Sequence, residues 1–327
     1  MKSILIRSIF AATPFLFCVS SAQAQTFPGE TVTLMVPYPP GGPADALARI
    51  VARPLAQILE TTLIVENMGG AGGALGGQKA LAQPADGNYL LQASPNEVIL
   101  APALNSAIKL KADDFRLLHP VAQGVLVLVT RNDLPARDAD ELIKLAEQRG
   151  DNTLTYGSVG VGTLNHLVME DIQRETGVEF VHVPYKGNNP LLQDLVGGQI
   201  DVAVLVYSAS LGGLAEKGAV RVIGQLGEQR SKLLPEVPTL AESRALRSLH
   251  HTTWAGIMVR KDTPTPIVQR LNDALSQVLR QQSVRQLLAD QTLDAVEPMS
   301  LESVAAFYQR EIDNYGRMLS ATEIKVQ

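Results

Sequence analysis

Cysteine is nearly absent from the sequence: Cys18 is the only one, and it lies in a segment that we expect the mature protein to lose. Residues 1–24 combine a basic start, an apolar centre and the small residues Ala22 and Ala24 at a cleavage site, which is the pattern of a secretory signal peptide. A membrane anchor is the alternative, but the apolar centre is shorter than the ~20 residues that span a bilayer. We therefore expect an exported chain, cleaved after Ala24, without thiols or disulfides.

Histidine and positive charge are also scarce. None of the five histidines has the spacing that puts two metal ligands on one helix face, so we expect no metal site and no other cofactor; they are His119, His166, His182, His250 and His251. The formal net charge is -5, and loss of Lys2 and Arg7 with the signal peptide makes the mature chain more acidic. Nucleic acid and anionic lipid are poor partners for such a surface. A small anion remains compatible, because local donors decide its binding.

The rest of the composition is typical of a globular protein. With 327 residues, of which 46% are hydrophobic, the chain can bury a core large enough for two domains. Strand-like runs alternate with apolar-periodic helices, which predicts an α/β fold of mostly parallel sheets flanked by helices. The predicted strands cover residues 31–36, 63–67, 89–93, 125–129, 152–156, 180–183, 202–206, 220–224 and 251–259. The predicted helices cover residues 43–60, 138–148, 164–175, 191–196, 263–279 and 300–319.

The pattern restarts near Gly124, which predicts two lobes. Residues 125–244 are expected to form the second lobe, inserted into a first lobe made of residues 25–124 and 245–327. Because the chain then crosses between the lobes twice, hinge motion about a cleft is expected.

Two strand-to-helix turns have the features of an anion-binding site. Free backbone N–H groups, side-chain hydroxyls and the positive end of the helix dipole come together at such a turn. The candidate ligand contacts in the first turn are Tyr38, Pro39, Gly41 and Gly42. The candidates in the second turn are Ser158, Gly160, Gly162, Thr163 and His166, although His166 is equally suited to bonding a neighbouring loop. Two such turns predict one negatively charged ligand held from two sides.

Further candidates come from the ends of other strands, each with a structural alternative. Ser94 and Asn96 follow a predicted strand, and ligands of open α/β sheets sit beyond the carboxyl ends of strands. Lys186 supplies a countercharge or is simply solvated. Asp201 accepts from an amino group of the ligand or holds a loop N–H. Tyr207 lines the cleft or packs in the core.

The second turn is close to two enzyme motifs, but it lacks a required residue of each. A phosphate-binding loop needs a lysine where Thr163 stands, so nucleotide hydrolysis is not favoured. A serine hydrolase places its nucleophile in a Gly-x-Ser-x-Gly elbow, but Tyr156 occupies the first glycine position before Ser158. A secreted hydrolase that uses Ser158 and His166 remains the alternative to a binding protein.

Motifs along the whole mature chain resemble the Bug family, the extracytoplasmic solute receptors of tripartite tricarboxylate transporters. The segments that carry the resemblance are residues 36–45, 65–67, 71–73, 156–162, 182–187, 195–201 and 237–242. The resemblance implies a periplasmic, two-lobed binding protein of the type II, Venus-flytrap class. It also implies a monomer that captures a small mono-, di- or tricarboxylate, or an amino acid, between its lobes.

The family also implies partners, namely the two membrane subunits of a cation-coupled carrier. A receptor that feeds a signalling partner is a further possibility. The sequence departs from the family at Met68-Gly69 and at residues 94–97, where Glu97 is expected either to repel a distal carboxylate or to bind an amine.

Overall fold

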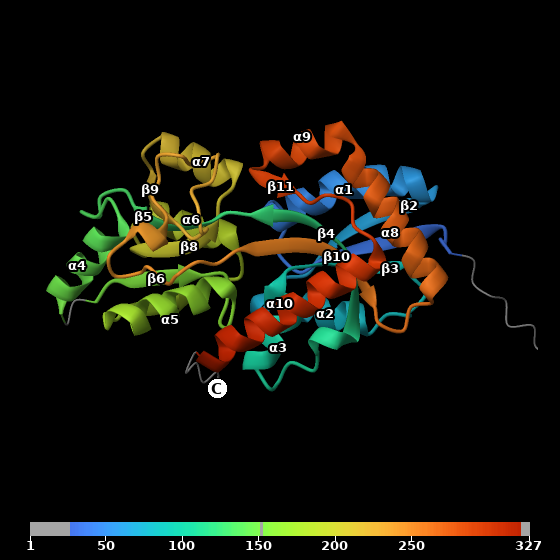
Figure 1. Cartoon of the computed structure of the whole chain (residues 1–327), viewed down its shortest axis with the longest axis horizontal. Helices are drawn as coiled ribbons and strands as arrows, with labels where there is room; N and C mark the ends of the chain where they lie inside the picture. Colours follow the sequence, from blue (N-terminus) through green and yellow to red (C-terminus); the bar gives the residue numbers. More distant parts are fainter. Residues whose placement is uncertain (1–26, 151–152, 322–327) are drawn as a thin grey trace, which may run out of the picture.

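The computed structural model describes residues 27–150 and 153–321. The predicted signal peptide, residues 1–24, lies outside this part of the chain. The described residues form two lobes side by side, each built on one sheet that is covered by helices (Figure 1). No helix within the described ranges is both long and apolar enough to cross a bilayer.

The first lobe has a six-stranded sheet in the order β11-β4-β10-β3-β1-β2. Its strands are β1 (Thr31–Val36), β2 (Thr62–Asn67), β3 (Tyr89–Ala93), β4 (Phe115–Gly124), β10 (Thr253–Arg260) and β11 (Leu293–Ala295). β1 pairs in parallel with β2 and β3, whereas β10 runs antiparallel to β3 and β4, and β11 runs antiparallel to β4.

The second lobe has a five-stranded sheet in the order β7-β6-β8-β5-β9. Its strands are β5 (Leu126–Arg131), β6 (Thr155–Ser158), β7 (Val181–Pro184), β8 (Val202–Val206) and β9 (Val220–Gln225). β6 is parallel to β7 and β8, and β5 is antiparallel to β8 and β9.

The α/β class and the two-lobed arrangement are as predicted. Most strands of each sheet run in one direction, namely β1, β2, β3 and β4 in the first and β6, β7, β8 and β9 in the second. The strands that run against them are β10 and β11 in the first sheet and β5 in the second. The chain crosses between the lobes through β5 and β10. The lobe boundaries at residues 124/125 and 244/245 stay a prediction.

Helices cover both sheets. The first lobe has α1 (Pro43–Leu59), α2 (Ala74–Leu81), α3 (Ala101–Leu104), α8 (Thr265–Arg280), α9 (Gln282–Asp290) and α10 (Leu301–Ala321). The second has α4 (Ala139–Arg149), α5 (Leu164–Thr176), α6 (Asn188–Val196) and α7 (Ala209–Glu216). Pro54 lies inside α1 without ending it, and its ring is buried with the apolar face of this 17-residue helix.

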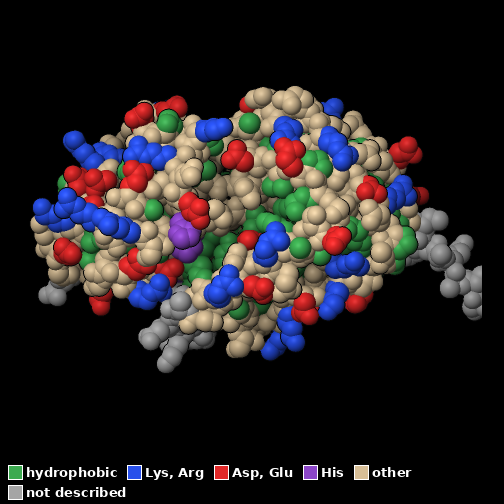
Figure 2. All heavy atoms as spheres, viewed as in Figure 1, with side chains coloured by type: hydrophobic (Ala, Val, Ile, Leu, Met, Phe, Trp, Pro, Cys, Tyr) green, Lys and Arg blue, Asp and Glu red, His purple; other side chains and the backbone are tan. Residues whose placement is uncertain are grey.

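The junction between the lobes is short on one side and long on the other. Only Val125 separates β4 from β5, whereas residues 226–252 connect β9 to β10. The largest apolar cluster is continuous across this junction, since it includes Met35 and Leu91 of one lobe together with Leu126 and Tyr156 of the other. Hydrophobic side chains show in the hollow between the lobes, while charges of both signs are interspersed over the rest of that face (Figure 2).

Candidate functional site

A cavity of about 130 Å³ lies between the lobes. Strand ends line one part of it, through Ala122 and Gly124 of β4, Thr253 of β10 and Val206 of β8. Pockets for drug-sized ligands measure ~300–1,000 Å³, so this cavity suits a small molecule. None of the described residues that line it carries a formal charge.

The first turn of α1 forms one wall of the cavity. Gly42, Pro43 and Ala44 line it, and no described residue accepts a hydrogen bond from the N–H of Gly42 or Ala44. Asp45 fixes the turn: its carboxylate accepts from the Gly41 N–H at 3.0 Å and from Asn67 Nδ2 at 3.0 Å. Burial raises the pKa of Asp45, but hydrogen bonds from Arg49, Gly41 and Asn67 together lower it below its ordinary value. The carboxylate therefore stays ionised and holds the N–H groups of the helix start toward the cavity.

The first turn of α6 forms the opposite wall, in the other lobe. Gly187, Asn188, Asn189 and Pro190 line the cavity, and the N–H groups of Asn188 and Asn189 likewise have no acceptor among the described residues. The two turns touch: a Cβ added to Gly41 would lie 3.5 Å from Asn189 Nδ2. Two helix N-termini, one from each lobe, thus meet at one uncharged cavity. Each end contributes about half a positive charge.

The second predicted turn, after β6, differs from expectation. Its N–H groups are already bonded within the protein: that of Gly162 donates to His166 Nδ1 at 3.0 Å, that of Gly160 to Ser158 Oγ at 3.3 Å, and that of Thr163 to the Gly160 carbonyl at 3.3 Å. Of the candidates in this turn, none lines the cavity. Although Asn165 of α5 lines the cavity, the helix of the second lobe that has free N–H groups in its first turn there is α6, and not α5.

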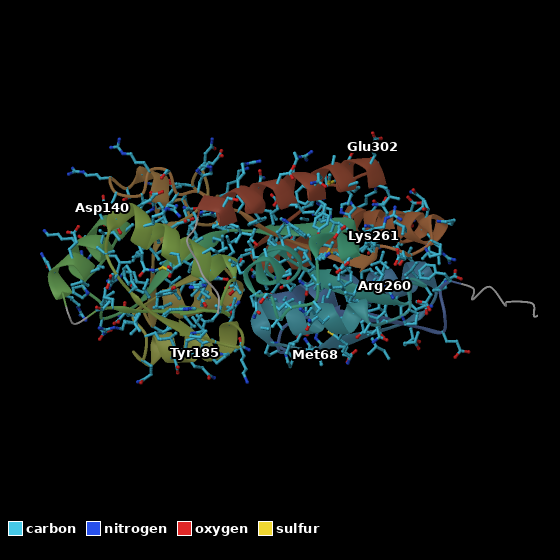
Figure 3. The ribbon with its side chains drawn as sticks, turned by 90° about the horizontal axis from the view of Figure 1, so that it is seen from below. Met68, Asp140, Tyr185, Arg260, Lys261 and Glu302 are labelled. Carbon is cyan, nitrogen blue, oxygen red and sulfur yellow. The ribbon has the colours of Figure 1, made fainter. Side chains whose placement is uncertain are left out.

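The same turn makes a contact between the lobes. Asn96, which lines the cavity, accepts a hydrogen bond from the Leu164 N–H at 2.8 Å and donates to Tyr38 Oη at 3.3 Å. Gly160 lies against Gly72, so that a Cβ at Gly160 would be 3.0 Å from Gly72 Cα. The glycine run at residues 69–73 therefore contacts the other lobe through Gly72. It also lines a second cavity of about 230 Å³, together with Tyr185. Tyr185 and Met68 lie on the same side of the molecule (Figure 3).

The predicted pair Ser158 and His166 does not form. Ser158 Oγ lies 2.7 Å from Nε2 of His182, and the His182 ring stacks between Tyr156 and His166 with its centroid 4.1 Å from that of His166. Burial, and then the nearby charge of His166, lower the pKa of His182 to about 4. Ser158 is 0% exposed, so the serine and histidine lie together without an approach for a substrate. The stacked rings of Tyr156, His182 and His166 thus connect β6 and β7 to the first turn of α5.

Glu97 is turned away from the cavity, contrary to both expectations for it. It is 0% exposed and accepts from the N–H of Ser94 at 2.5 Å and from Ser94 Oγ at 2.8 Å. Burial raises its pKa to about 7, against hydrogen bonds from Tyr38 and Ser94 that lower it. Glu97 therefore holds Ser94 and Tyr38 at the rim of the cavity and does not itself line it.

The remaining candidates lie outside the cavity. Lys186 is exposed at the second cavity. Asp201 bonds Arg131 Nε at 2.8 Å and the N–H of Thr155 at 2.8 Å, which is the structural alternative for this residue. The carbonyl of Tyr207 accepts from Thr292 Oγ1 at 2.8 Å, across the lobe junction. No group of three or more metal-ligand side chains occurs within residues 27–150 and 153–321.

Comparison with known proteins places this geometry in a family. Residues 47–324 match the model of the tripartite tricarboxylate transporter family receptor. The chain belongs to this receptor family. The resemblance noted in the sequence is thereby confirmed.

Individual relatives agree with the assignment. The receptor is 32% identical to the UPF0065 protein in the tcbD-tcbE intergenic region of Pseudomonas sp. (strain P51), over 84% of this chain and 82% of that one. It is 29% identical to the MatC (Rpa3494) structure from Rhodopseudomonas palustris with bound malate, with a TM-score of 0.82 over 89% of this chain and 99% of that one. It is 26% identical to the R. palustris Rpa4515 structure with adipate, with a TM-score of 0.83 over 90% and 98% of the two chains. These neighbours share the two-lobed periplasmic binding fold.

Sequence reasoning missed several residues that line the receptor's cavity, among them Asn165, Asn188, Asn189, Thr253, Trp254 and Gln92. A signal existed for two regions. Gly187 precedes a helix in the same way as Gly42 and Gly162 do in the two predicted turns, and Gln92 is the one polar residue between Leu90 and Ala93 in an apolar strand. The others come together only through the crossing strands.

Proposed function

We propose that this receptor captures a small carboxylate in the cavity between its lobes and delivers it to a membrane carrier. The observation that carries the proposal is the pair of helix N-termini, α1 and α6, that meet at an uncharged cavity. Malate and adipate in the related structures support a carboxylic acid as the ligand.

The binding energy comes from N–H groups and not from a charged side chain. A hydrogen bond to a charged group contributes ~1.5–3 kcal/mol, so three or four converging donors reach the ~8 kcal/mol of a micromolar complex. Because the donors are divided between the lobes, the ligand binds fully only when the lobes are together. The crossing at Val125 and the return over residues 226–252 serve as the hinge in this proposal.

The proposal includes the cellular setting that was expected from the sequence. The chain is exported, its signal peptide is cleaved after Ala24, and it acts as a monomer without enzymatic activity. Its partners are the two membrane subunits of a tripartite tricarboxylate transporter, and a signalling partner is the alternative.

Titration of the purified receptor with mono-, di- and tricarboxylates by calorimetry tests the proposal. Asn188→Ala removes a side chain at the start of α6, and Asn188→Pro also removes the N–H at a position where proline fits a helix start. We expect Asn188→Pro to bind the acid at least ~10-fold more weakly than Asn188→Ala, from the loss of one charge-assisted hydrogen bond.

Ala209→Pro, at the first position of α7, is the matched control and should leave the affinity unchanged. If no organic acid binds the parent protein, or if Asn188→Pro and Asn188→Ala bind equally well, the proposal is wrong.

A further inference from the structure

Gln92 is the feature of the cavity that carboxylate binding does not account for. It lies on β3, is 2% exposed and lines the cavity beside Leu47 and Ala44 of α1. Its amide oxygen is shielded from solvent and has no hydrogen-bond partner among the described residues. A buried amide without a partner destabilises the folded protein, so its retention at a binding cavity points to a ligand.

The equally buried Gln225 shows what a structural glutamine looks like in this chain. Its Nε2 donates to the carbonyls of Leu234 and Val237 at 2.9 and 2.6 Å, and its Oε1 accepts from the Ser231 N–H at 2.7 Å. Every polar atom of that side chain is bonded. Gln92 differs because its amide oxygen has no hydrogen-bond partner among the described residues.

The neighbouring polar side chains are already engaged. Asn96 bonds Leu164 and Tyr38, Ser94 bonds Glu97, and Asn165 donates to the carbonyl of Val204 at 2.7 Å. Gln92 is therefore the side chain of this group that is buried, lines the cavity and has an amide oxygen without a hydrogen-bond partner.

We infer that Gln92 determines specificity by binding a hydroxyl group that the ligand carries near its carboxylate. This inference rests on the proposed function and narrows its ligand to short hydroxy acids. A carboxylate only accepts hydrogen bonds, whereas an amide offers one donor face and one acceptor face. A hydroxyl both donates and accepts, so it satisfies either orientation of the amide. A cationic amino group lacks a countercharge here, because the described lining has no acidic side chain.

The remainder of the lining fits the carbon skeleton of such an acid. Hydrocarbon side chains line the same cavity as the amide and the two helix ends, together with the indole ring of Trp254: Leu47, Ala122, Val159, Val206 and Leu293. A ligand without the hydroxyl fills the same space but leaves the Gln92 amide unpaired. Sites built to bond a hydroxyl discriminate strongly against analogues that lack it.

Matched pairs of acids test the inference: lactate and propionate, 3-hydroxybutyrate and butyrate, malate and succinate. We expect the parent protein to bind the hydroxy member of at least one pair ~5-fold or more tightly. Gln92→Met keeps the side-chain length without an amide. It should bring that ratio to within about twofold.

Gln123→Met is the control for the substitution itself, because Gln123 is exposed on β4 and does not line the cavity; it should keep the parent ratio. Thermal unfolding checks that Gln92→Met is folded. Equal affinities within every pair in the parent, or an unchanged ratio in Gln92→Met, would overturn the inference while carboxylate binding survives. If the parent binds none of the acids, the proposed function fails as well.

Discussion

Gly160→Ala should separate contact between the lobes from contact with the ligand. Gly160 has a φ of +148°, and a Cβ there would lie 3.0 Å from Gly72 Cα and 3.1 Å from Gly72 N, in the other lobe. Backbone strain of ~1–3 kcal/mol acts whether the lobes are together or apart. The clash with Gly72 acts only when they are together. Overpacking of this kind is worth ~1–2 kcal/mol, so the Kd for the carboxylate should rise by about 5- to 30-fold.

Calorimetry with the tightest acid measures this Kd, and small-angle scattering of the ligand-free protein should show a larger radius of gyration. Gly177→Ala is the matched control: Gly177 also has a positive φ, of +73°, but a Cβ there meets nothing within 4 Å. It should lower the midpoint of thermal unfolding without changing the Kd. The reasoning is refuted if Gly160→Ala and Gly177→Ala bind the acid equally well.

Three further predictions concern buried charges. Burial raises the pKa of Glu97 from 4.5 to about 7. The contribution of the protonated Glu97 side chain to stability is therefore fully present below pH 4.5 and is lost as the pH rises through 7. Glu97→Gln should unfold at a higher temperature than the parent at pH 8 and at the same temperature at pH 4. Burial and the charge of His166 lower the pKa of His182 from 6.5 to about 4, so the contribution of neutral His182 to stability is fully present above pH 6.5 and is lost as the pH falls through 4. The free energy of unfolding, measured with denaturant, should therefore decrease less between pH 6.5 and pH 4 in His182→Phe than in the parent. An equal decrease in both proteins contradicts the prediction. Asp201→Asn breaks the 2.8 Å ion pair with Arg131 and should reduce the free energy of unfolding by ~1–3 kcal/mol with an unchanged Kd; an altered Kd would instead favour a contact with the ligand.

Most of the elements could be predicted from the sequence because their periodicity is local. β1 and β3 begin and end at the predicted residues. The helix predicted for residues 138–148 is α4, which starts at Ala139 after Asp138, whose side chain accepts from the Glu141 N–H at 2.8 Å. β4 was missed because Pro120 lies within it, and proline is rare in central strands. Its partner β10 accommodates the proline by a register shift between Ala255 and Gly256.

The position of the site was partly predictable for a related reason. A glycine-rich turn before a helix is visible in the sequence, and Gly41 and Gly42 correctly indicated the start of α1. Whether N–H groups remain available depends on side chains that fold back on them. His166 and Asn96 occupy those of the second turn, and only tertiary structure shows this.

The cavity's lack of charged side chains has a consequence for unloading at the membrane. A receptor that bound its ligand through an arginine side chain would still attract the carboxylate electrostatically after the lobes had begun to separate. In this protein each lobe contributes only the N-terminus of a helix, and the attraction of a helix N-terminus for an anion falls off within about one turn of the helix. In the proposed function, a small separation of the two lobes therefore weakens the hold on the acid, and no charged side chain of the lining has to be neutralised first.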